Sequence, residues 1–354
     1  PFFGDGMVHG IRVRDGRAEW YRNRFVRTPF FANPDLNIMD PSVLMDMTCS
    51  KANTHVVGHA GRFYALEEGH FPYLLDGNLD TIGATDFGGR LKGSFTAHPK
   101  ICPTTGEMVA FGYSFLEPYL TYLRVSATGE LAQVENITVG GPTMMHDFSV
   151  MPRTGTDADV KWYDINPCYV FHPMNSYEDG DNIVLDVARF PYMWKSSGVD
   201  FPKPYLWRFT INTVTGRVSE EQVDDRSAEF PRVADANIAR PYRYGYMMSA
   251  SGRPDEPAEQ AGAILKYDRH TGTRTSIEFG RGRVGGEPVF APAENARHED
   301  DGYLMTFVYD ATTDSSEYVV YDAASMDSEP LARVDLPRVP SGFHGSWVPS
   351  SVAD

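Results

Sequence analysis

Four of the ten histidines share a local sequence pattern that could support metal chemistry. Each follows a nonpolar residue and precedes a turn-prone one, in Ala97-His98-Pro99, Met145-His146-Asp147, Phe171-His172-Pro173 and Phe343-His344-Gly345. Such a histidine is expected at a strand end, where the chain leaves the core and the imidazole can point into a central space. Because neutral imidazole is the commonest metal ligand of proteins, these four residues are candidate ligands.

The spacing of these histidines does not distinguish a metal site from a structural role. None forms a local HxxxH or HxH pair, and a strand-end histidine can simply hydrogen-bond to the backbone. A β-propeller would gather ligands from distant blades, so wide separation permits a metal site without indicating one. Other histidines, such as His270 beside Thr271-Gly272 and His298, are interpreted as solvated turn residues. Both interpretations of the four remain open on the residues alone.

The elements that would position these histidines are short strands. Asp-Gly pairs such as Asp15-Gly16 and Asp301-Gly302, and Thr-Gly pairs such as Thr128-Gly129, supply the positive φ that tight hairpins require. The best helical candidate is the short stretch from Pro41 to Met47. Runs rich in β-branched and aromatic residues predict strands at Ile183–Ala188, Tyr205–Thr210, Tyr303–Val308 and Tyr318–Tyr321.

Many short strands separated by regular turns predict an all-β sandwich, barrel or propeller, and a chain of 354 residues favours the propeller. No repeated WD or kelch signature is present, so the pattern does not give a number of blades. No linker, low-complexity segment or charge block divides the chain. We therefore expect a single domain over residues 1–354.

The composition is acidic, with a net charge of −16. This charge argues against binding to nucleic acid and against docking by charge on an anionic membrane. The three cysteines, Cys49, Cys102 and Cys168, are far apart and have no zinc-site spacing, which indicates a reducing compartment. No signal peptide opens the sequence, and no apolar run reaches the roughly 18 to 20 residues that span a bilayer. We expect a soluble cytoplasmic protein.

Eight motifs occur in order along the chain, and together they resemble the carotenoid cleavage oxygenase family. This family also contains stilbene-cleaving dioxygenases and a retinoid isomerase. The matching segments are Gly4–Gly10, Ala52-Asn53-Thr54 with His59-Ala60-Gly61, Thr96–Lys100, Met145–Phe148, Phe171–Glu178, Glu229–Pro231, Glu287–Phe290 and Phe343–Gly345.

The resemblance implies a seven-bladed β-propeller with the active site on its axis under a loop cap. It implies an Fe(II) ion bound by His98, His146, His172 and His344. It also implies that Glu68, Glu229 and Glu287 accept the ring N–H of three of these ligands, which fixes their orientation and offsets the charge of the ion. Thr54 matches a family threonine beside an open coordination position.

The reaction implied by the resemblance is cleavage of an alkene C=C bond of a lipophilic or aromatic substrate by O₂, giving two carbonyl products. Stilbene-cleaving members resemble one another in having a lysine directly before the first of these glutamates, where it meets a phenolic oxygen. This chain has Glu67 there, which favours a carotenoid or apocarotenoid. Because Glu67 could accept a hydrogen bond from a neutral hydroxyl, a phenolic stilbene stays an alternative, and isomerisation of a retinoid is a third.

Two further classes remain as alternatives: a propeller that binds ligands without catalysis, and a glycosidase-like propeller, although no pair stands out among the 48 acidic residues. The sequence also leaves open a peripheral contact with a membrane. Relatives carry some tens of additional residues between the Asp147-Phe148 motif and the segment after Met151. We therefore expect that residues are missing between Val150 and Met151, and that an N-terminal segment before Pro1 is missing as well.

Overall fold

The structure is a computed structural model that describes residues 4–150, 156–195, 198–199, 202–249 and 262–350. The chain forms two compact units. The first contains residues 1–146, 155–160 and 343–354, and the second contains residues 147–154 and 161–342. The predicted break between Val150 and Met151 adjoins residues 151–155, which lie outside the described residues.

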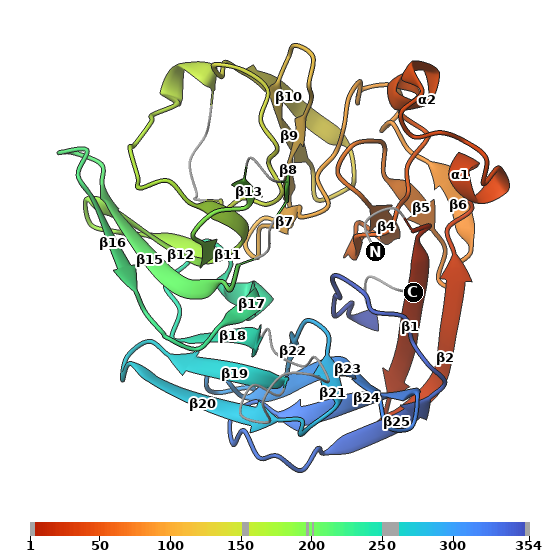
Figure 1. Cartoon of the computed structure of the whole chain (residues 1–354), viewed down its shortest axis with the longest axis vertical. Helices are drawn as coiled ribbons and strands as arrows, with labels where there is room; N and C mark the ends of the chain where they lie inside the picture. The colour runs from red at the N-terminus through yellow and green to blue at the C-terminus, as the bar shows by residue number, and fades with distance from the viewer. Residues whose placement is uncertain (1–3, 151–155, 196–197, 200–201, 250–261, 351–354) are drawn as a thin grey trace. The chain divides into compact units, whose positions relative to one another are not determined.

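The first unit contains two four-stranded antiparallel sheets, with strand orders β3-β4-β5-β6 and β10-β9-β8-β7, and the two-stranded ribbon β1-β2 (Figure 1). Its elements are β1 (Met7–Arg14), β2 (Arg17–Phe25), α1 (Pro29–Ala32), α2 (Pro41–Met45), β3 (His55–His59), β4 (Arg62–Leu66), β5 (Tyr73–Leu75), β6 (Thr81–Ala84), β7 (Lys100–Ile101), β8 (Met108–Tyr113), β9 (Leu120–Val125), β10 (Leu131–Ile137) and the 3₁₀ turn η1 (Asp157–Asp159).

The second unit contains three larger antiparallel sheets: β11-β12-β15-β16, β17-β18-β19-β20, and a five-stranded sheet of β21 to β25. The ribbon β13-β14 is a separate sheet. The elements of the second unit are β11 (Tyr169–Asp179), β12 (Asn182–Phe190), β13 (Trp194–Lys195), β14 (Gly198–Val199), β15 (Tyr205–Asn212), β16 (Val218–Gln222), β17 (Ala228–Arg232), η2 (Asp235–Asn237), β18 (Tyr244–Ser249), β19 (Ala263–Asp268), β20 (Thr273–Glu278), β21 (Arg283–Gly285), β22 (Val289–Pro292), β23 (Gly302–Asp310), β24 (Ser315–Asp322) and β25 (Ala332–Leu336).

Successive four-stranded antiparallel sheets are the blades of a β-propeller, so the predicted all-β propeller class is confirmed. The predicted number of seven blades is wrong for the described residues, which form five sheets of four or five strands. The remaining sheets, β1-β2 and β13-β14, have only two strands each. No helix among the described residues has the length and apolar character needed to cross a bilayer.

The local predictions are confirmed where the pattern was strongest. The four predicted strands lie within β12, β15, β23 and β24. The predicted helix is α2, which begins at Pro41 and is capped by the side chain of Asp40, an acceptor for the Ser42 N–H at 2.8 Å. Asp15 and Gly16 form the hairpin turn between β1 and β2 with φ of 49° and 70°.

Gly302, of the Asp301-Gly302 pair that was predicted to form a tight turn, has a different structural role. It begins β23 instead of forming a tight turn, and it pairs with Pro292. A Cβ atom at this position would lie 2.4 Å from the carbonyl oxygen of Ala291, so the close approach of two strands requires glycine there.

The core of the first unit holds the chain immediately before His98. Phe95 and Ala97 are fully buried and belong to a cluster with Tyr64, Leu66 and Leu123, side chains from the two four-stranded sheets of that unit. The residue between them is buried as well. Packing against this core therefore holds in place the chain that leads into His98.

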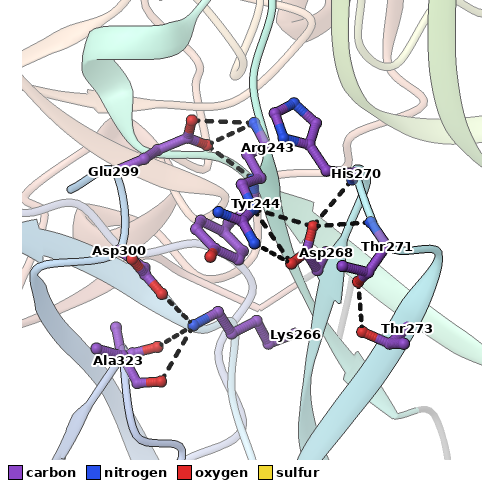
Figure 2. A network of polar contacts seen from close by, with 11 residues as sticks. Arg243, Tyr244, Lys266, Asp268, His270, Thr271, Thr273, Glu299, Asp300 and Ala323 are labelled. Atoms are coloured by element: carbon purple, nitrogen blue, oxygen red, sulfur yellow. Dashed lines mark hydrogen bonds and ion pairs between the residues drawn. The ribbon is translucent and has the colours of Figure 1, made fainter.

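A buried lysine in the second unit joins three chain segments (Figure 2). Nζ of Lys266, on β19, donates to Asp300 Oδ2 at 2.6 Å and to the carbonyl oxygen of Ala323 at 2.7 Å. The ammonium group also lies 4.3 Å from the ring centroid of Tyr244. Because the lysine is almost completely buried, its charge is compensated by these partners instead of by water.

We predict that Lys266→Met destabilises the protein strongly, because Asp300 would be left as a buried carboxylate without its cation. The loss should be on the order of 3–5 kcal/mol, the cost of breaking a buried pair. Arg338→Ala is the control, since its pair with Asp314 is about two thirds exposed and its removal should cost less than about 1 kcal/mol. Urea unfolding measures both; equal midpoints for the two variants would contradict the prediction.

Candidate metal centre

Three of the predicted histidines, His98, His146 and His344, lie together in the first unit. Their ligand nitrogen atoms lie within 4.8 Å of one another. The Nε2 atoms of His98 and His146 are 3.1 Å apart, and the ring of His98 meets that of His344 edge-on with centroids 4.4 Å apart. Two imidazoles bound at right angles to one ion at about 2.1 Å would place their nitrogens about 3.0 Å apart, so this pair fits a shared metal ion.

The backbone of two of these histidines is fixed by nearby threonines. The N–H of His98 donates to Thr96 Oγ1 at 3.0 Å, two residues before the start of β7. The N–H of His344 donates to the carbonyl oxygen of Thr54 at 3.2 Å. His98 therefore lies just before a strand begins, whereas the sequence pattern predicted the point where a strand ends.

Glu68 orients His146 in the first unit. Its Oε1 forms a close ion-pair contact with Nδ1 of His146, and its Oε2 accepts a hydrogen bond from the hydroxyl of Tyr113 at 2.9 Å. An ionised carboxylate only accepts, so Nδ1 carries the proton and the lone pair is on Nε2. This tautomer is the one that can bind a metal with the nitrogen that faces His98.

His172 lies in the second unit at an irregularity of β11. The pattern Phe171-His172-Pro173 predicted a strand end, but β11 continues to Asp179. The register with β12 shifts between Val170 and Pro173, so His172 falls in a bulge. Proline has no N–H to continue the ladder, and a bulge changes the direction in which a side chain points.

Glu229 is bonded to His172 in the second unit. Its Oε2 accepts from His172 Nδ1 at 2.6 Å and also receives the N–H of Phe230. Phe230 has a positive φ of 53° and its ring stacks on the imidazole of His172, 5.5 Å between centroids. Such a backbone conformation costs a non-glycine residue about 1–3 kcal/mol, which the surrounding contacts must offset.

The electrostatic surroundings of His172 are dominated by acids. Burial lowers the pKa of this imidazole, but the carboxylate of Glu229, together with Asp147 and Glu287, raises it, and the net direction is upward. Glu287 is buried and forms an ion pair with Arg232, Nη1 to Oε1 at 3.7 Å. The carboxylates that raise the pKa of His172 thus include Glu229 and Glu287, two of the three predicted glutamates.

The remaining predicted residues, Thr54 and Glu67, lie in the first unit on either side of the β3-β4 hairpin. The Thr54 hydroxyl donates to Asn53 Oδ1 at 3.2 Å. Glu67 Oε1 accepts from the N–H of Gly69 at 3.0 Å and pairs with His70 Nδ1 at 2.5 Å. The Glu67 carboxylate is therefore engaged within its own turn.

A fifth histidine, His55, was not identified from the sequence. It lies on β3, is 8% exposed, and its ring centroid is 5.5 Å from that of His344 and 6.0 Å from that of His98. The signal available in the sequence was its position directly after the Ala52-Asn53-Thr54 motif. A single histidine in a strand has no pattern of its own, so only the folded structure shows its neighbours.

Comparison with known proteins gives matches over almost the whole chain. The model of the family described as retinal pigment epithelial membrane protein matches residues 1–150 and 148–349. A carotenoid cleavage oxygenase of Mycobacterium tuberculosis is 34% identical over 442 residues, covering 99% of this chain and 88% of the relative. Among solved structures, cobalt-substituted Synechocystis ACO is 27% identical with a TM-score of 0.84. Lignostilbene dioxygenase of Pseudomonas brassicacearum is 25% identical with a TM-score of 0.87. Each structural match covers 98% of this chain and 88% of the other.

The alignment with the mycobacterial protein is longer than the chain. The match to the mycobacterial protein spans 442 residues, whereas this sequence has 354. That relative therefore has segments with no counterpart in this sequence. The two matches to the family model meet at residues 148–150, next to the predicted break between Val150 and Met151.

We predict that Glu68→Ala weakens the binding of a divalent metal ion about 10–100-fold, because His146 loses the acceptor that fixes its tautomer. Tyr113→Phe is the matched control: it removes one hydrogen bond to Glu68 but leaves the contact of Glu68 with His146. A titration of the metal-free protein with Co²⁺ measures the affinity. The same affinity in Glu68→Ala and in the parent would remove Glu68 from the site.

Proposed function

Because this chain belongs to the family of the retinal pigment epithelial membrane protein, which includes carotenoid cleavage oxygenases, we propose that it is a non-haem Fe(II) dioxygenase. It cleaves one C=C bond of a carotenoid or apocarotenoid with O₂ and releases two carbonyl products. The observation that carries the proposal is the cluster of His98, His146 and His344 with Glu68 behind it.

The proposed metal ligands are His98, His146 and His344, with His172 as the fourth. The chemistry of the donors supports this set: in two of the four histidines, His146 and His172, a glutamate contacts Nδ1 and leaves Nε2 for the metal. Glu287 is proposed as the third of these acids, and its burial supports a role for it inside the protein. Thr54 is proposed to lie beside an open coordination position.

When bound, Fe(II) would supply the activation of O₂. The residues of the chain perform the other tasks. Imidazoles without charge leave the double charge of the ion uncompensated, and Glu68 and Glu229 offset it from outside the ligand set. They also hold the Nδ1 protons of His146 and His172, so neither ring can turn to present the wrong nitrogen. No general acid or base is needed among these residues, because the proposed reaction transfers no proton.

Glu67 supports a carotenoid or apocarotenoid substrate over a hydroxystilbene. An acid at this position cannot replace the cation that a phenolic oxygen would meet, and it would repel a phenolate. Its Oε1 is already paired with His70 and Gly69. The alternative, a stilbene or other phenylpropanoid, is favoured by the similarity to lignostilbene dioxygenase, which has the higher TM-score of the two structures compared.

The proposal includes an architecture in which the two units form one propeller domain, with the active site on its axis under a loop cap. It also includes further residues between Val150 and Met151. The meeting of the two family matches at residues 148–150 supports the internal segment. The partners would be O₂ and a lipophilic alkene, and not nucleic acid, in keeping with a net charge of −16.

A cytoplasmic location with peripheral contact to a membrane fits such a substrate, which would partition into lipid. Exposed apolar side chains in the loop between β8 and β9 support this part of the proposal: Phe115 is 76% and Leu116 is 62% exposed.

We predict that protein purified without oxygen contains about one iron per chain, the content of a mononuclear site. His172→Ala should lose both the metal and the cleavage of apocarotenals, measured by metal analysis, oxygen uptake and mass spectrometry of products. His270→Ala, an exposed turn histidine, is the control and should retain both. A folded protein without iron, or with iron but inactive on carotenoids, apocarotenals and hydroxystilbenes, would favour the alternative of a non-catalytic ligand-binding propeller.

We predict that Glu67→Lys raises hydroxystilbene cleavage relative to apocarotenal cleavage at least severalfold, because it supplies a cation for the phenolic oxygen. Glu67→Gln removes the negative charge and retains an acceptor for the Gly69 N–H, so it separates loss of the acid from gain of the cation. The ratio of kcat/KM for the two substrates is the measurement. An unchanged ratio in Glu67→Lys would show that this position does not select the substrate.

A further inference from the structure

We propose that His55 is a positioning residue that fastens together the two chain segments carrying His98 and His344. This inference rests on the proposed function, because it concerns two of the proposed metal ligands. All three histidines belong to the first unit.

Both ring nitrogens of His55 are engaged, and their partners define the tautomer. Nδ1 lies 2.9 Å from the carbonyl oxygen of Ala97, and Nε2 lies 2.9 Å from Oγ of Ser346. A carbonyl oxygen only accepts, so Nδ1 donates its proton. In the neutral ring Nε2 is then an acceptor, and the hydroxyl of Ser346 donates to it. One neutral tautomer satisfies both bonds.

The two partners of His55 lie next to or near two different proposed ligands in the sequence. Ala97 directly precedes His98, and Ser346 follows His344 by two residues. The N–H of His344 also donates to the carbonyl oxygen of Thr54, the neighbour of His55. The start of β3 therefore holds the segment of His344 at two points and the segment of His98 at one.

The segment of His344 depends on such contacts for its position. Residues 343–349 belong to no helix or strand, so no ladder of backbone hydrogen bonds fixes them. A metal ligand must be held to within about 0.5 Å of its working position. A buried side chain that bonds both segments provides this constraint, because it keeps the ring of His344 at 4.4 Å from that of His98, centroid to centroid.

His55 acts through other residues and not as a ligand. Although its ring lies about as close to His344 as the ligand rings lie to one another, a nitrogen that donates to Ala97 and a nitrogen that accepts from Ser346 leave no lone pair for a metal. Among the described residues, one group of histidines has ligand atoms close enough to hold a metal ion, and His55 does not belong to it.

The test compares five proteins with the parent after the metal is removed. His55→Ala removes both bonds. His55→Asn keeps an amide N–H near the position of Nδ1 and loses the reach to Ser346, whereas Ser346→Ala removes the same second bond from the other side. His59→Ala is the matched control, since His59 is buried on the same strand and bonds the carbonyl oxygen of Gly106 at 2.9 Å. Glu68→Ala is a reference for a weakened site.

Co²⁺ titration with visible absorption gives the first readout. His55→Ala should weaken Co²⁺ binding about 10–100-fold, as loss of a residue behind a ligand does, and should change the ligand-field spectrum. His55→Asn and Ser346→Ala should resemble each other and show a smaller loss. His59→Ala should bind as the parent does. Equal weakening in His55→Ala and His59→Ala, or an unchanged affinity and spectrum in His55→Ala, would overturn the proposal.

Hydrogen exchange of the metal-free proteins gives the second readout, which does not depend on metal. The peptide covering residues 343–350 should exchange faster in His55→Ala and Ser346→Ala than in the parent or in His59→Ala. If the parent itself fails to bind Co²⁺, the proposed function fails while this comparison still decides the role of His55. Unchanged exchange in both His55→Ala and Ser346→Ala would overturn that role.

Discussion

The contact between a buried carboxylate and the Nδ1 of a histidine is the interaction on which the candidate site depends. Glu68 contacts His146 in this way, and Glu229 contacts His172. A histidine without such a partner has two tautomers and a ring that can rotate. With the partner, the proton is held on one nitrogen and the other is left as a metal ligand. The same acids supply negative charge where a divalent ion would otherwise be surrounded by neutral groups.

The backbone of each unit departs from regular structure where it serves these contacts. In the second unit, β11 is bulged at His172 and β17 changes register after Glu229. Phe230, between Glu229 and the next paired residue, has a positive φ. In the first unit, His98 precedes β7, and His344 lies in a segment without strand or helix. Ladders of regular hydrogen bonds point side chains alternately to the two faces of a sheet, and a converging set of ligands requires exceptions.

Residues that are not proposed ligands hold the groups around the candidate site in place. Tyr113 holds the second oxygen of Glu68, and His55 bonds the segments that carry His98 and His344. Lys266, on β19, bonds Asp300 in the loop before β23 and so joins two chain segments of the second unit. Glu67 has an acidic side chain and is paired with His70.

Much of the fold and part of the site followed from local sequence. Strands such as β12 and β23, the Asp15-Gly16 turn and the helix after Asp40 could be predicted, because each depends on neighbours within a few residues. The resemblance identified the four histidines and the three glutamates, and the structure brings His98, His146 and His344 together and pairs two of the acids with histidines. The number of blades was predicted wrongly for the described residues, because no repeat period encodes it and the prediction came from the resemblance to a family.

The sequence by itself determined the local turns and strands and the all-β class, and its resemblance to a known family indicated the residues of a metal site. Only the tertiary structure decided that His172 lies in a bulge and not at a strand end, and that Glu67 is bonded within its own turn. It also decided that His55 bonds the segments that carry His98 and His344. The physical reason is distance along the chain. Ser346 is 291 residues from His55, and contacts over that separation depend on how sheets pack, which no local pattern of residues specifies.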